Sequence, residues 1–302
     1  MAIIPSPLEQ IKNPLFEEKE LEVWIKRDDL IHPTIMGNKW RKLKYNLEFA
    51  KKERYEGVLT FGGAYSNHIA ATAAACYEHS LPSIGIIRGE ELNADSNATL
   101  RFASNHGMHL EFINREAYRN VRSNPDAYEL RTQGNYYRLP EGGTNGMAIK
   151  GCAEIIRELP DSFDFITTPL GTGGTMAGLL KGMEGNGMLL GFSSLKGAFV
   201  RNDFQKLIDS QHINFSNFKI LTDYHFGGYA KVPDDLIAFI NRTKAKFDLQ
   251  FDPIYNGKMY FGVLKLIDQD YFRRKSKILV LHTGGLQGVS AFNDHRNQIA
   301  LH

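Results

Sequence analysis

A lysine near the start of the chain, Lys39, has surroundings that suggest chemistry rather than packing. It lies in the segment Met36-Gly-Asn-Lys-Trp-Arg-Lys-Leu43, where a helix is expected to begin. A cation is unfavourable at a helix N-terminus unless an anion is present there. Lysine amines form Schiff bases with carbonyl cofactors. Lys42 lies three residues later on the same helical face, so it can supply a positive charge to the same ligand.

A glycine-rich segment far downstream gives a second chemical signal. It consists of Gly171, Thr172, Gly173, Gly174 and Thr175, between an apolar run and an expected helix. Such a turn directs backbone N–H groups and a helix N-terminus at a phosphate. A dinucleotide motif would have a sixth-position glycine where Met176 stands, and the Gly-Lys-Ser/Thr of a P-loop is also absent. One phosphate site and an imine-forming lysine together suggest pyridoxal phosphate (PLP), the commonest carbonyl cofactor.

Three consecutive polar residues, Ser66, Asn67 and His68, follow a glycine pair in Phe61-Gly-Gly-Ala-Tyr-Ser-Asn-His68. Ser66 or Asn67 can simply cap the helix expected next. A cap needs neither two preceding glycines nor three polar groups in succession. The segment therefore also suits the binding of a carboxylate and a phenolate-like oxygen at a helix N-terminus. The motif G-x-S-x-G is absent, which argues against hydrolase chemistry.

Two tyrosines and a histidine occupy glycine-bearing turns further along. Tyr229 ends Asp223-Tyr-His-Phe-Gly-Gly-Tyr229, and Tyr255 lies in Asp252-Pro-Ile-Tyr-Asn-Gly-Lys258. Aromatic residues exposed in such turns usually have a functional reason. His282, in Leu281-His-Thr-Gly-Gly-Leu286, is either a site residue or a hydrogen-bonded core histidine.

The composition argues against several classes of protein. The 302-residue chain is 42% apolar with a formal net charge of +2, so it has no strong field to attract nucleic acid or an anionic membrane. The basic run Arg273-Arg-Lys-Ser-Lys277 fits the start of a strand. We find no membrane-spanning stretch, signal-peptide pattern or metal-ligand spacing. Cys76 and Cys152 are expected to be buried reduced thiols, and we expect a cytoplasmic protein.

Short apolar runs alternate with helical patterns, which predicts mostly parallel sheets with helices on both faces. We expect strands at 58–61, 83–87, 109–113, 163–167, 189–192 and 278–281. We expect helices at 40–54, 67–78, 97–105, 145–159 and 175–183. Glycine pairs punctuate strand ends at 62–63, 142–143, 173–174 and 284–285. Ligands bind beyond the carboxyl ends of parallel strands, so the four pairs indicate several backbone segments around one ligand.

The ordered set of motifs resembles one enzyme family. The set comprises Gly37-Asn-Lys-x-Arg-Lys-Leu43, Gly62-Gly-x-x-Ser-Asn67, Gly171-Thr-Gly-Gly-Thr175, Asp252-Pro-x-Tyr-x-Gly-Lys258 and His282-Thr-Gly-Gly285. It is similar to the 1-aminocyclopropane-1-carboxylate deaminase / D-cysteine desulfhydrase family of tryptophan-synthase-β-like PLP enzymes. The resemblance implies an α/β fold of two open, twisted, mostly parallel sheets flanked by helices, with the cofactor in a cleft between two lobes. We place a large PLP-binding domain at 1–44 plus 146–302 and a small domain at 45–145. Homodimers are usual in the family.

The resemblance also implies roles for individual residues. Lys39 matches the lysine that holds PLP as an imine. Lys42 and residues 171–175 match positions beside the cofactor phosphate. Asn67 matches the asparagine beside the 3-oxygen of the pyridine ring. Ser66 matches a serine that touches the substrate and assists proton transfer.

Of the residues expected around the substrate, two match the pattern of the family and two depart from it. Tyr229 and Tyr255 match active-site tyrosines that polarise or attack the substrate. His68 stands where the cyclopropane deaminases have glutamine, and is similar to the desulfhydrases. Tyr65 stands where both branches usually have glutamine. We expect Tyr65, Asn67 and His68, with Ser66, to contact the substrate.

Two further departures concern the pyridine nitrogen. The cyclopropane deaminases carry a glutamate where this chain has Asn256 and a leucine where it has Thr283. A carboxylate keeps the nitrogen protonated and makes the ring a stronger electron sink, whereas Asn256 and Thr283 offer only hydrogen bonds. Expelling a thiolate needs a weaker sink than opening a cyclopropane ring. We therefore predict PLP-dependent α,β-elimination on a small amino acid, with D-cysteine as the first candidate and no nucleic-acid, membrane or metal partner.

Three alternatives stay open. The first is deamination of 1-aminocyclopropane-1-carboxylate, which gives 2-oxobutanoate and ammonia. The second is a non-catalytic PLP-binding protein, which the departures at Tyr65 and Asn256 allow. The third is a nucleotide-binding Rossmann protein, which the incomplete glycine motif disfavours.

Overall fold

The computed structural model describes residues 1–124, 128, 134–296 and 299, and its described strands form two sheets. The larger sheet contains β1 (Leu8–Gln10), β2 (Glu22–Arg27), β7 (Phe165–Leu170), β8 (Met188–Ser193), β9 (Phe218–Leu221) and β10 (Lys277–His282). Their spatial order is β1-β2-β10-β7-β8-β9, and β1 alone runs antiparallel to its neighbour. The smaller sheet contains β3 (Gly57–Gly63), β4 (Ser83–Arg88), β5 (Met108–Ile113) and β6 (Tyr136–Leu139). It has the order β5-β4-β3-β6 and is parallel throughout.

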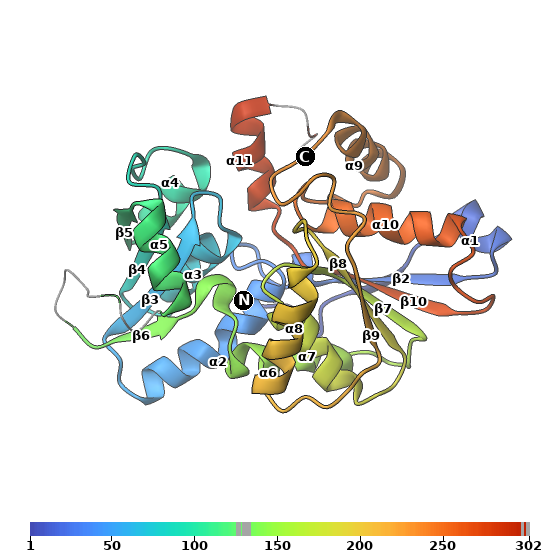
Figure 1. Cartoon of the computed structure of the whole chain (residues 1–302), viewed down its shortest axis with the longest axis horizontal. Coiled ribbons are helices and arrows are strands. Elements are labelled where there is room, and N and C mark those ends of the chain that lie inside the picture. Colours follow the sequence, from blue (N-terminus) through green and yellow to red (C-terminus); the bar gives the residue numbers. More distant parts are fainter. Residues whose placement is uncertain (125–127, 129–133, 297–298, 300–302) are drawn as a thin grey trace.

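Helices cover both sheets, as Figure 1 shows with the smaller sheet at the left and the larger sheet at the right. The smaller sheet contacts α3 (Asn67–Glu78), α4 (Ala98–Asn105) and α5 (Arg115–Ser123). The larger sheet contacts α1 (Pro14–Glu18), α7 (Gly174–Met183) and α10 (Asn256–Asp268). The remaining helices are α2 (Asn38–Lys52), α6 (Gly146–Arg157), α8 (Phe199–Ser210), α9 (Asp234–Phe247) and α11 (Gln287–Arg296), with the short turns η1 (Asp28–Leu30) and η3 (Glu141–Gly143). The expected α/β fold is confirmed.

The larger sheet is buried on both faces, which explains the unbroken apolar run of β10. Along this strand, Ile278 and Val280 pack in a cluster that includes residues of α10. Leu279 and Leu281, which point to the other face, pack in a second cluster that includes residues of α7. A strand covered on both faces needs apolar residues at every position rather than at alternate ones. The carboxyl ends of such strands are therefore the places where polar residues can reach a ligand.

Most of the elements expected from the sequence are present, with one shifted strand. Helix 67–78 has the observed bounds, and the strands expected at 58–61, 83–87, 109–113, 189–192 and 278–281 lie within observed ones. The strand expected at 163–167 is wrong at both ends, because β7 pairs with β8 from Phe165 as far as Leu170. The elements that the sequence pattern missed are β1, β2, β6, β9, α1, α5, α8, α9, α10 and α11.

Two further sequence-based expectations concern the cysteines and membranes. Cys76 and Cys152 are buried and unpaired, as expected. Burial raises the pKa of the Cys76 thiol to about 12, so it is not a nucleophile at neutral pH. Over the described residues, no helix is both long and apolar enough to cross a lipid bilayer.

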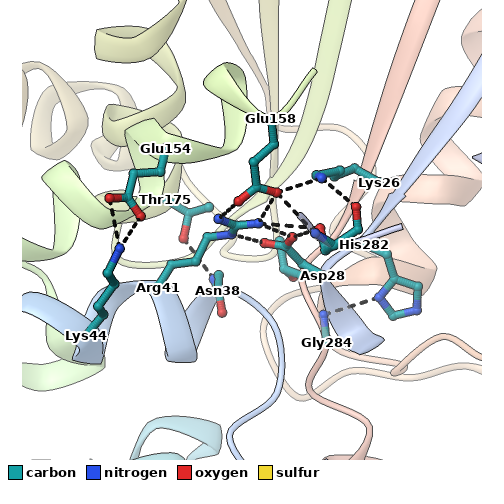
Figure 2. A network of polar contacts seen from close by, with 12 residues as sticks. Lys26, Asp28, Asn38, Arg41, Lys44, Glu154, Glu158, Thr175, His282 and Gly284 are labelled. Carbon is teal, nitrogen blue, oxygen red and sulfur yellow. Dashed lines mark hydrogen bonds and ion pairs between the residues drawn. The ribbon is translucent and has the colours of Figure 1, made fainter. Parts of the chain in front are cut away.

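The first turns of α2 are fixed by a buried ion-pair network, shown in Figure 2. The Arg41 guanidinium is fully buried and donates to both carboxylate oxygens of Asp28, at 2.7 and 2.8 Å. It also donates to both oxygens of Glu158, at 2.7 and 2.9 Å. Lys26 lies 2.7 Å from Glu158 and donates to the Ser6 carbonyl at 2.6 Å. The network therefore joins α2 to β2, to η1 and to the end of α6.

Removing the cation at the centre of this network should be costly. We expect Arg41→Met to lower the free energy of unfolding by about 3–5 kcal/mol, because the buried Asp28 carboxylate loses its cation and Glu158 keeps only Lys26. Urea denaturation measures the loss. As a matched control, Arg274→Met removes an exposed pair with Glu20 and should cost less than about 1 kcal/mol. Equal losses in the two variants would contradict the structural role of Arg41.

The same network should make the protein sensitive to acid. Burial opposes the charge of Glu158, but hydrogen bonds from Arg41 and Lys26 outweigh it and lower the pKa of the carboxyl. A carboxyl with a lowered pKa in the folded state stabilises the fold above its unfolded-state pKa. We expect this stabilisation to disappear as the pH falls through the folded-state pKa of Glu158, and to be absent from Glu158→Gln at every pH. Urea midpoints between pH 7 and pH 3 measure both.

Candidate active site

A cavity of about 500 Å³ is lined by segments that follow β3, β4, β6, β7, β8 and β10, so strands of both sheets end at it. Most residues singled out from the sequence line it together. They are Lys39, Lys42, Tyr65, Ser66, Asn67, His68, Gly171, Thr172, Gly173, Thr175, Tyr229, Tyr255, Asn256 and Thr283. Gly174 lies immediately beside the lining, because a Cβ at this position would stand 3.1 Å from Lys42 Nζ.

Lys39 lies in the first turn of α2, two positions after a conformationally demanding glycine. Gly37 has a φ of +61°, and a Cβ there would stand 1.9 Å from the Thr283 carbonyl oxygen, so only glycine fits. Lys39 Nζ donates to Asn38 Oδ1 at 3.3 Å, and Asn38 Nδ2 donates to Thr175 Oγ1 at 2.8 Å, the contact drawn in Figure 2. Burial of the amine lowers the pKa of Lys39 to about 7. A large share of this amine is therefore unprotonated near neutral pH, as a nucleophile or base requires.

A second lysine and a helix N-terminus form an anion site in the same cavity. Lys42 is 2% exposed, and its ammonium donates to the Gly142 carbonyl at 3.0 Å and to Thr144 Oγ1 at 3.2 Å. Within the described residues no carboxylate pairs with it, and burial lowers its pKa. The glycine-rich segment opens α7 beside this ammonium, and the first N–H groups of a helix have no partner within it. A bound phosphate would satisfy the buried cation and these donors together.

The N-terminus of α3 forms another side of the cavity. Ser66 is the N-cap, and its hydroxyl accepts a hydrogen bond from the Ile69 N–H at 3.3 Å. The Asn67 side chain lies against the turn after β10, where a Cβ on Gly285 would stand 2.7 Å from Asn67 Nδ2. Tyr65 is 46% exposed at the edge of the cavity. The capping role of Ser66 and its place in the cavity are therefore compatible.

His68 lines the cavity but is held by the protein. It is buried, with Nε2 2.7 Å from Thr60 Oγ1 and Nδ1 3.4 Å from Thr72 Oγ1. Burial, with the nearby lysine charges, lowers its pKa well below the usual histidine value. His68 is therefore a neutral ring whose two nitrogens already have hydroxyl partners.

The sequence left open whether His282 is a site residue or a hydrogen-bonded core histidine, and the structure shows a core histidine. Its Nε2 lies 2.7 Å from the Gln250 carbonyl oxygen, and its Nδ1 accepts from the Gly284 N–H at 3.2 Å. The fully buried ring also packs on Phe251, with centroids 4.8 Å apart. His282 thus fixes the glycine turn after β10, as Figure 2 shows, and is absent from the lining of the cavity.

The two tyrosines form a pair. Their rings are T-shaped, with centroids 5.7 Å apart. Burial raises the pKa of Tyr255 well above its usual value, and Tyr229 adds to this shift. A Cβ on Gly171 would lie 3.1 Å from the Tyr255 ring, so the glycine permits the ring to pack on the glycine-rich segment. Both hydroxyls keep their protons at neutral pH and can donate them.

Asn256 has no hydrogen-bonding capacity left for a ligand. Its Nδ2 donates to Asp252 Oδ2 at 2.6 Å and to the Gly284 carbonyl at 2.8 Å. Its Oδ1 accepts from the Thr283 N–H at 2.9 Å and from the Thr283 hydroxyl at 3.1 Å. Two donated and two accepted bonds saturate an amide. Asn256 and Thr283 were both expected to meet the pyridine nitrogen. Only the Thr283 hydroxyl oxygen keeps lone pairs for a ligand, and Asn256 orients that hydroxyl.

Sequence reasoning missed several residues of the site. Asn38, Thr144 and Glu141 line the cavity and connect its segments, and Arg88 also lines it. Arg88 directly follows the expected strand 83–87, so the position of polar residues at strand ends could have identified it. Thr144 and Glu141 form hydrogen bonds or ion pairs with segments distant in sequence, and no local sequence pattern predicts such contacts.

Comparison with known proteins gives consistent results. The chain matches the family model for pyridoxal-phosphate dependent enzymes over residues 1–284. It is 31% identical to the bifunctional D-cysteine desulfhydrase/1-aminocyclopropane-1-carboxylate deaminase of Arabidopsis thaliana, over 96% of this chain and 78% of the relative. It is 26% identical to a D-cysteine desulfhydrase of Klebsiella pneumoniae, over 96% and 94% of the two chains. The solved structure of an ACC deaminase homologue has a TM-score of 0.81 at 25% identity, covering 96% of this chain and 92% of the other.

The lowered pKa of Lys39 predicts unusual reactivity of the protein without ligand. Acetylation of Lys39 by acetic anhydride should rise with pH around a midpoint near 7, because the neutral amine reacts. Lys44, on the same helix, is the internal comparison: burial opposes its charge, but a hydrogen bond to Glu154 outweighs this and raises its pKa. At pH 8 we expect roughly tenfold more labelling at Lys39 than at Lys44, measured by peptide mass spectrometry. Equal labelling would show that Lys39 is an ordinary lysine.

Proposed function

The chain belongs to the family of pyridoxal-phosphate-dependent enzymes, and we propose that it catalyses α,β-elimination on a small amino acid, as a D-cysteine desulfhydrase does. One observation carries the proposal. The amine of Lys39, whose pKa is lowered to about 7, lies in the same cavity as the Lys42 ammonium, which has no carboxylate partner among the described residues. The similarity to a D-cysteine desulfhydrase and to a bifunctional relative supports the substrate class. With D-cysteine and water, the products are pyruvate, ammonia and hydrogen sulfide.

The residues of the cavity fit pyridoxal phosphate. The buried Lys42 ammonium lacks a carboxylate partner in the described chain and lies beside the N-terminus of α7, so a phosphate group completes this site. We assign residues 171–175 and Lys42 to the phosphate and Lys39 to the aldehyde carbon. Asn67 is assigned to the ring 3-oxygen and the Thr283 hydroxyl to the ring nitrogen.

The elimination itself follows from the protonation states of the side chains. When bound, PLP supplies an aldehyde that joins amines and a ring that accepts the electrons released at the substrate Cα. Lys39, freed by the substrate amine, takes the Cα proton on Nζ, which a pKa near 7 allows at neutral pH. The Cβ–S bond then breaks as a Cα=Cβ bond forms, and the sulfur leaves as a thiolate. Water hydrolyses the released enamine to pyruvate and ammonia.

The leaving thiolate needs a proton, and the tyrosine pair can supply it. Burial raises the pKa of both Tyr229 and Tyr255, so both hydroxyls are protonated at neutral pH. We assign them to donation to the sulfur rather than to nucleophilic attack. Ser66, at the N-terminus of α3, is assigned to the substrate carboxylate and to proton transfer, with Asn67, His68 and Tyr65 around it.

Deamination of 1-aminocyclopropane-1-carboxylate is the second candidate function. It is favoured by the bifunctional relative, which carries both activities in its name. It is also favoured by Asp252, a buried carboxylate that reaches Thr283 through Asn256. Both reactions require the same Lys39, Lys42 and glycine-rich segment, so product analysis must separate them.

We further propose the organisation of the whole molecule. Residues 1–44 with 146–302 form the large PLP-binding domain, and residues 45–145 form the small domain, a division supported by the ordering of the strands in the two sheets. The unpaired buried cysteines support a cytoplasmic, reducing environment. The family resemblance supports a homodimer, which light scattering in solution tests.

The proposal predicts products that are simple to assay. The purified, cofactor-loaded protein should release sulfide and pyruvate in equal amounts from D-cysteine. Lys39→Ala should lose at least about a thousandfold in rate, because it removes both the cofactor link and the base. Lys52→Ala changes an exposed lysine of the same helix and should leave the rate unchanged.

Two outcomes would separate the candidates. Release of 2-oxobutanoate from 1-aminocyclopropane-1-carboxylate, without sulfide from D-cysteine, would replace elimination by the second function. Undiminished activity of Lys39→Ala would refute the assignment of the lysine whichever substrate is used.

A further inference from the structure

The cavity contains an arginine without a counter-ion. Arg88 is the last residue of β4, and it lies opposite Gly63 in the pairing of β4 with β3. It lines the cavity at the carboxyl edge of the smaller sheet. Among the described residues, no carboxylate forms an ion pair with its guanidinium and no acceptor takes a hydrogen bond from it. The Arg88 side chain is exposed, so its N–H donors are available to an anionic ligand in the cavity.

The surrounding side chains orient this guanidinium. It lies 5.8 Å from the ring centroid of Tyr118, which is 2% exposed. The Tyr118 hydroxyl donates to Glu141 at 2.8 Å, and Arg122 binds the other oxygen of Glu141 at 2.8 Å. Glu141, a carboxylate of the same cavity, is therefore already engaged by two donors. A buried aromatic ring beneath a guanidinium limits the directions in which its N–H groups can point.

The position of Arg88 relates it to the groups that handle the substrate. Its Nη2 would be 3.4 Å from a Cβ on Gly63, the residue that begins the segment leading to Ser66 and α3. Burial raises the pKa of Tyr229, and the charge of Arg88 partly opposes this rise. Arg88 thus lies beside the segment that leads to α3, and its charge also acts on Tyr229. Lys42 and α7, which we assign to the phosphate, are on separate segments.

We propose that Arg88 binds a carboxylate of the amino-acid substrate. This inference rests on the proposed function only in taking an amino acid as the ligand. The planar guanidinium can hold a carboxylate by two parallel hydrogen bonds, a geometry that an ammonium cannot reproduce. The carboxylate has two sources: the α-carboxylate of every amino acid, which Arg88 would share with Ser66, and a second carboxylate on an acidic side chain. The second source would make the site selective for dicarboxylic amino acids.

Equilibrium binding to the cofactor-loaded protein tests the inference without turnover. The probes are the D and L enantiomers of alanine, with one carboxylate, and of aspartate, with two. Calorimetry gives the dissociation constants for the unaltered protein, Arg88→Gln, Arg88→Lys and the control Arg274→Gln. Arg274 is an exposed arginine paired with Glu20 outside the cavity. Visible spectra before the titration verify equal cofactor content in all four proteins.

We expect Arg88→Gln to weaken binding by roughly 10- to 100-fold, the effect of losing a charge-assisted pair, and Arg88→Lys to weaken it less. Arg274→Gln should bind as the unaltered protein does. Equal weakening for alanine and aspartate identifies the α-carboxylate, and weakening for aspartate alone identifies a side-chain carboxylate. Unchanged binding of all probes by Arg88→Gln, or no binding of any probe to the unaltered protein, would overturn the inference. Failure to release sulfide from D-cysteine would instead count against the elimination reaction and leave these binding constants valid.

Discussion

The buried guanidinium of Arg41 is the constraint on which the active site depends. It comes two positions after Lys39 on α2, and at about 100° per residue this places the two side chains on nearly opposite faces of the helix. Arg41 binds Asp28 and Glu158 on one face. Lys39, with Lys42 three residues later, is thereby presented to the cavity on the other. The charges in the network balance, because Lys26 and Arg41 face two carboxylates, so the burial of four ions is electrostatically tolerable.

The two lysines of the cavity, Lys39 and Lys42, are in contrast enclosed without carboxylates to balance their charge among the described residues. The charge of Lys42 contributes to the lowered pKa of Lys39, and the N-terminus of α7 adds a partial positive charge beside Lys42. Without ligand the site therefore concentrates positive potential, and an anion relieves it. The chemistry of the lysine follows from this arrangement, because an amine is unprotonated at neutral pH only where its charged form is disfavoured. The same electrostatics thus favour an anion beside Lys42 and a neutral amine at Lys39, the two features on which the proposed function rests.

Local signals in the sequence were sufficient for some elements and insufficient for others. Helix α3 was predicted with its observed bounds because its cap, Ser66, is adjacent to it. Strand β2 was missed because Lys26 resembles a solvent-facing residue, and its burial depends on Glu158, which is distant in sequence. Lys39 was identifiable because a cation after glycine at a helix start is locally anomalous. The saturation of Asn256 was not, because its partners include backbone groups of the turn after β10.

The chain of hydrogen bonds from Asp252 through Asn256 to Thr283 changes the argument about the electron sink. The sequence suggested that a carboxylate was absent near the ring nitrogen, yet the Asp252 carboxylate is linked through Asn256 to Thr283, the residue that we assign to that nitrogen. Because Asp252 accepts from Asn256 Nδ2, the amide oxygen must face Thr283, and the hydroxyl hydrogen is committed to that oxygen. Thr283 then offers lone pairs to the cavity, which favours a ring nitrogen that carries a proton. The influence of the Asp252 carboxylate is thereby transmitted in weakened form, which suits the expulsion of a thiolate.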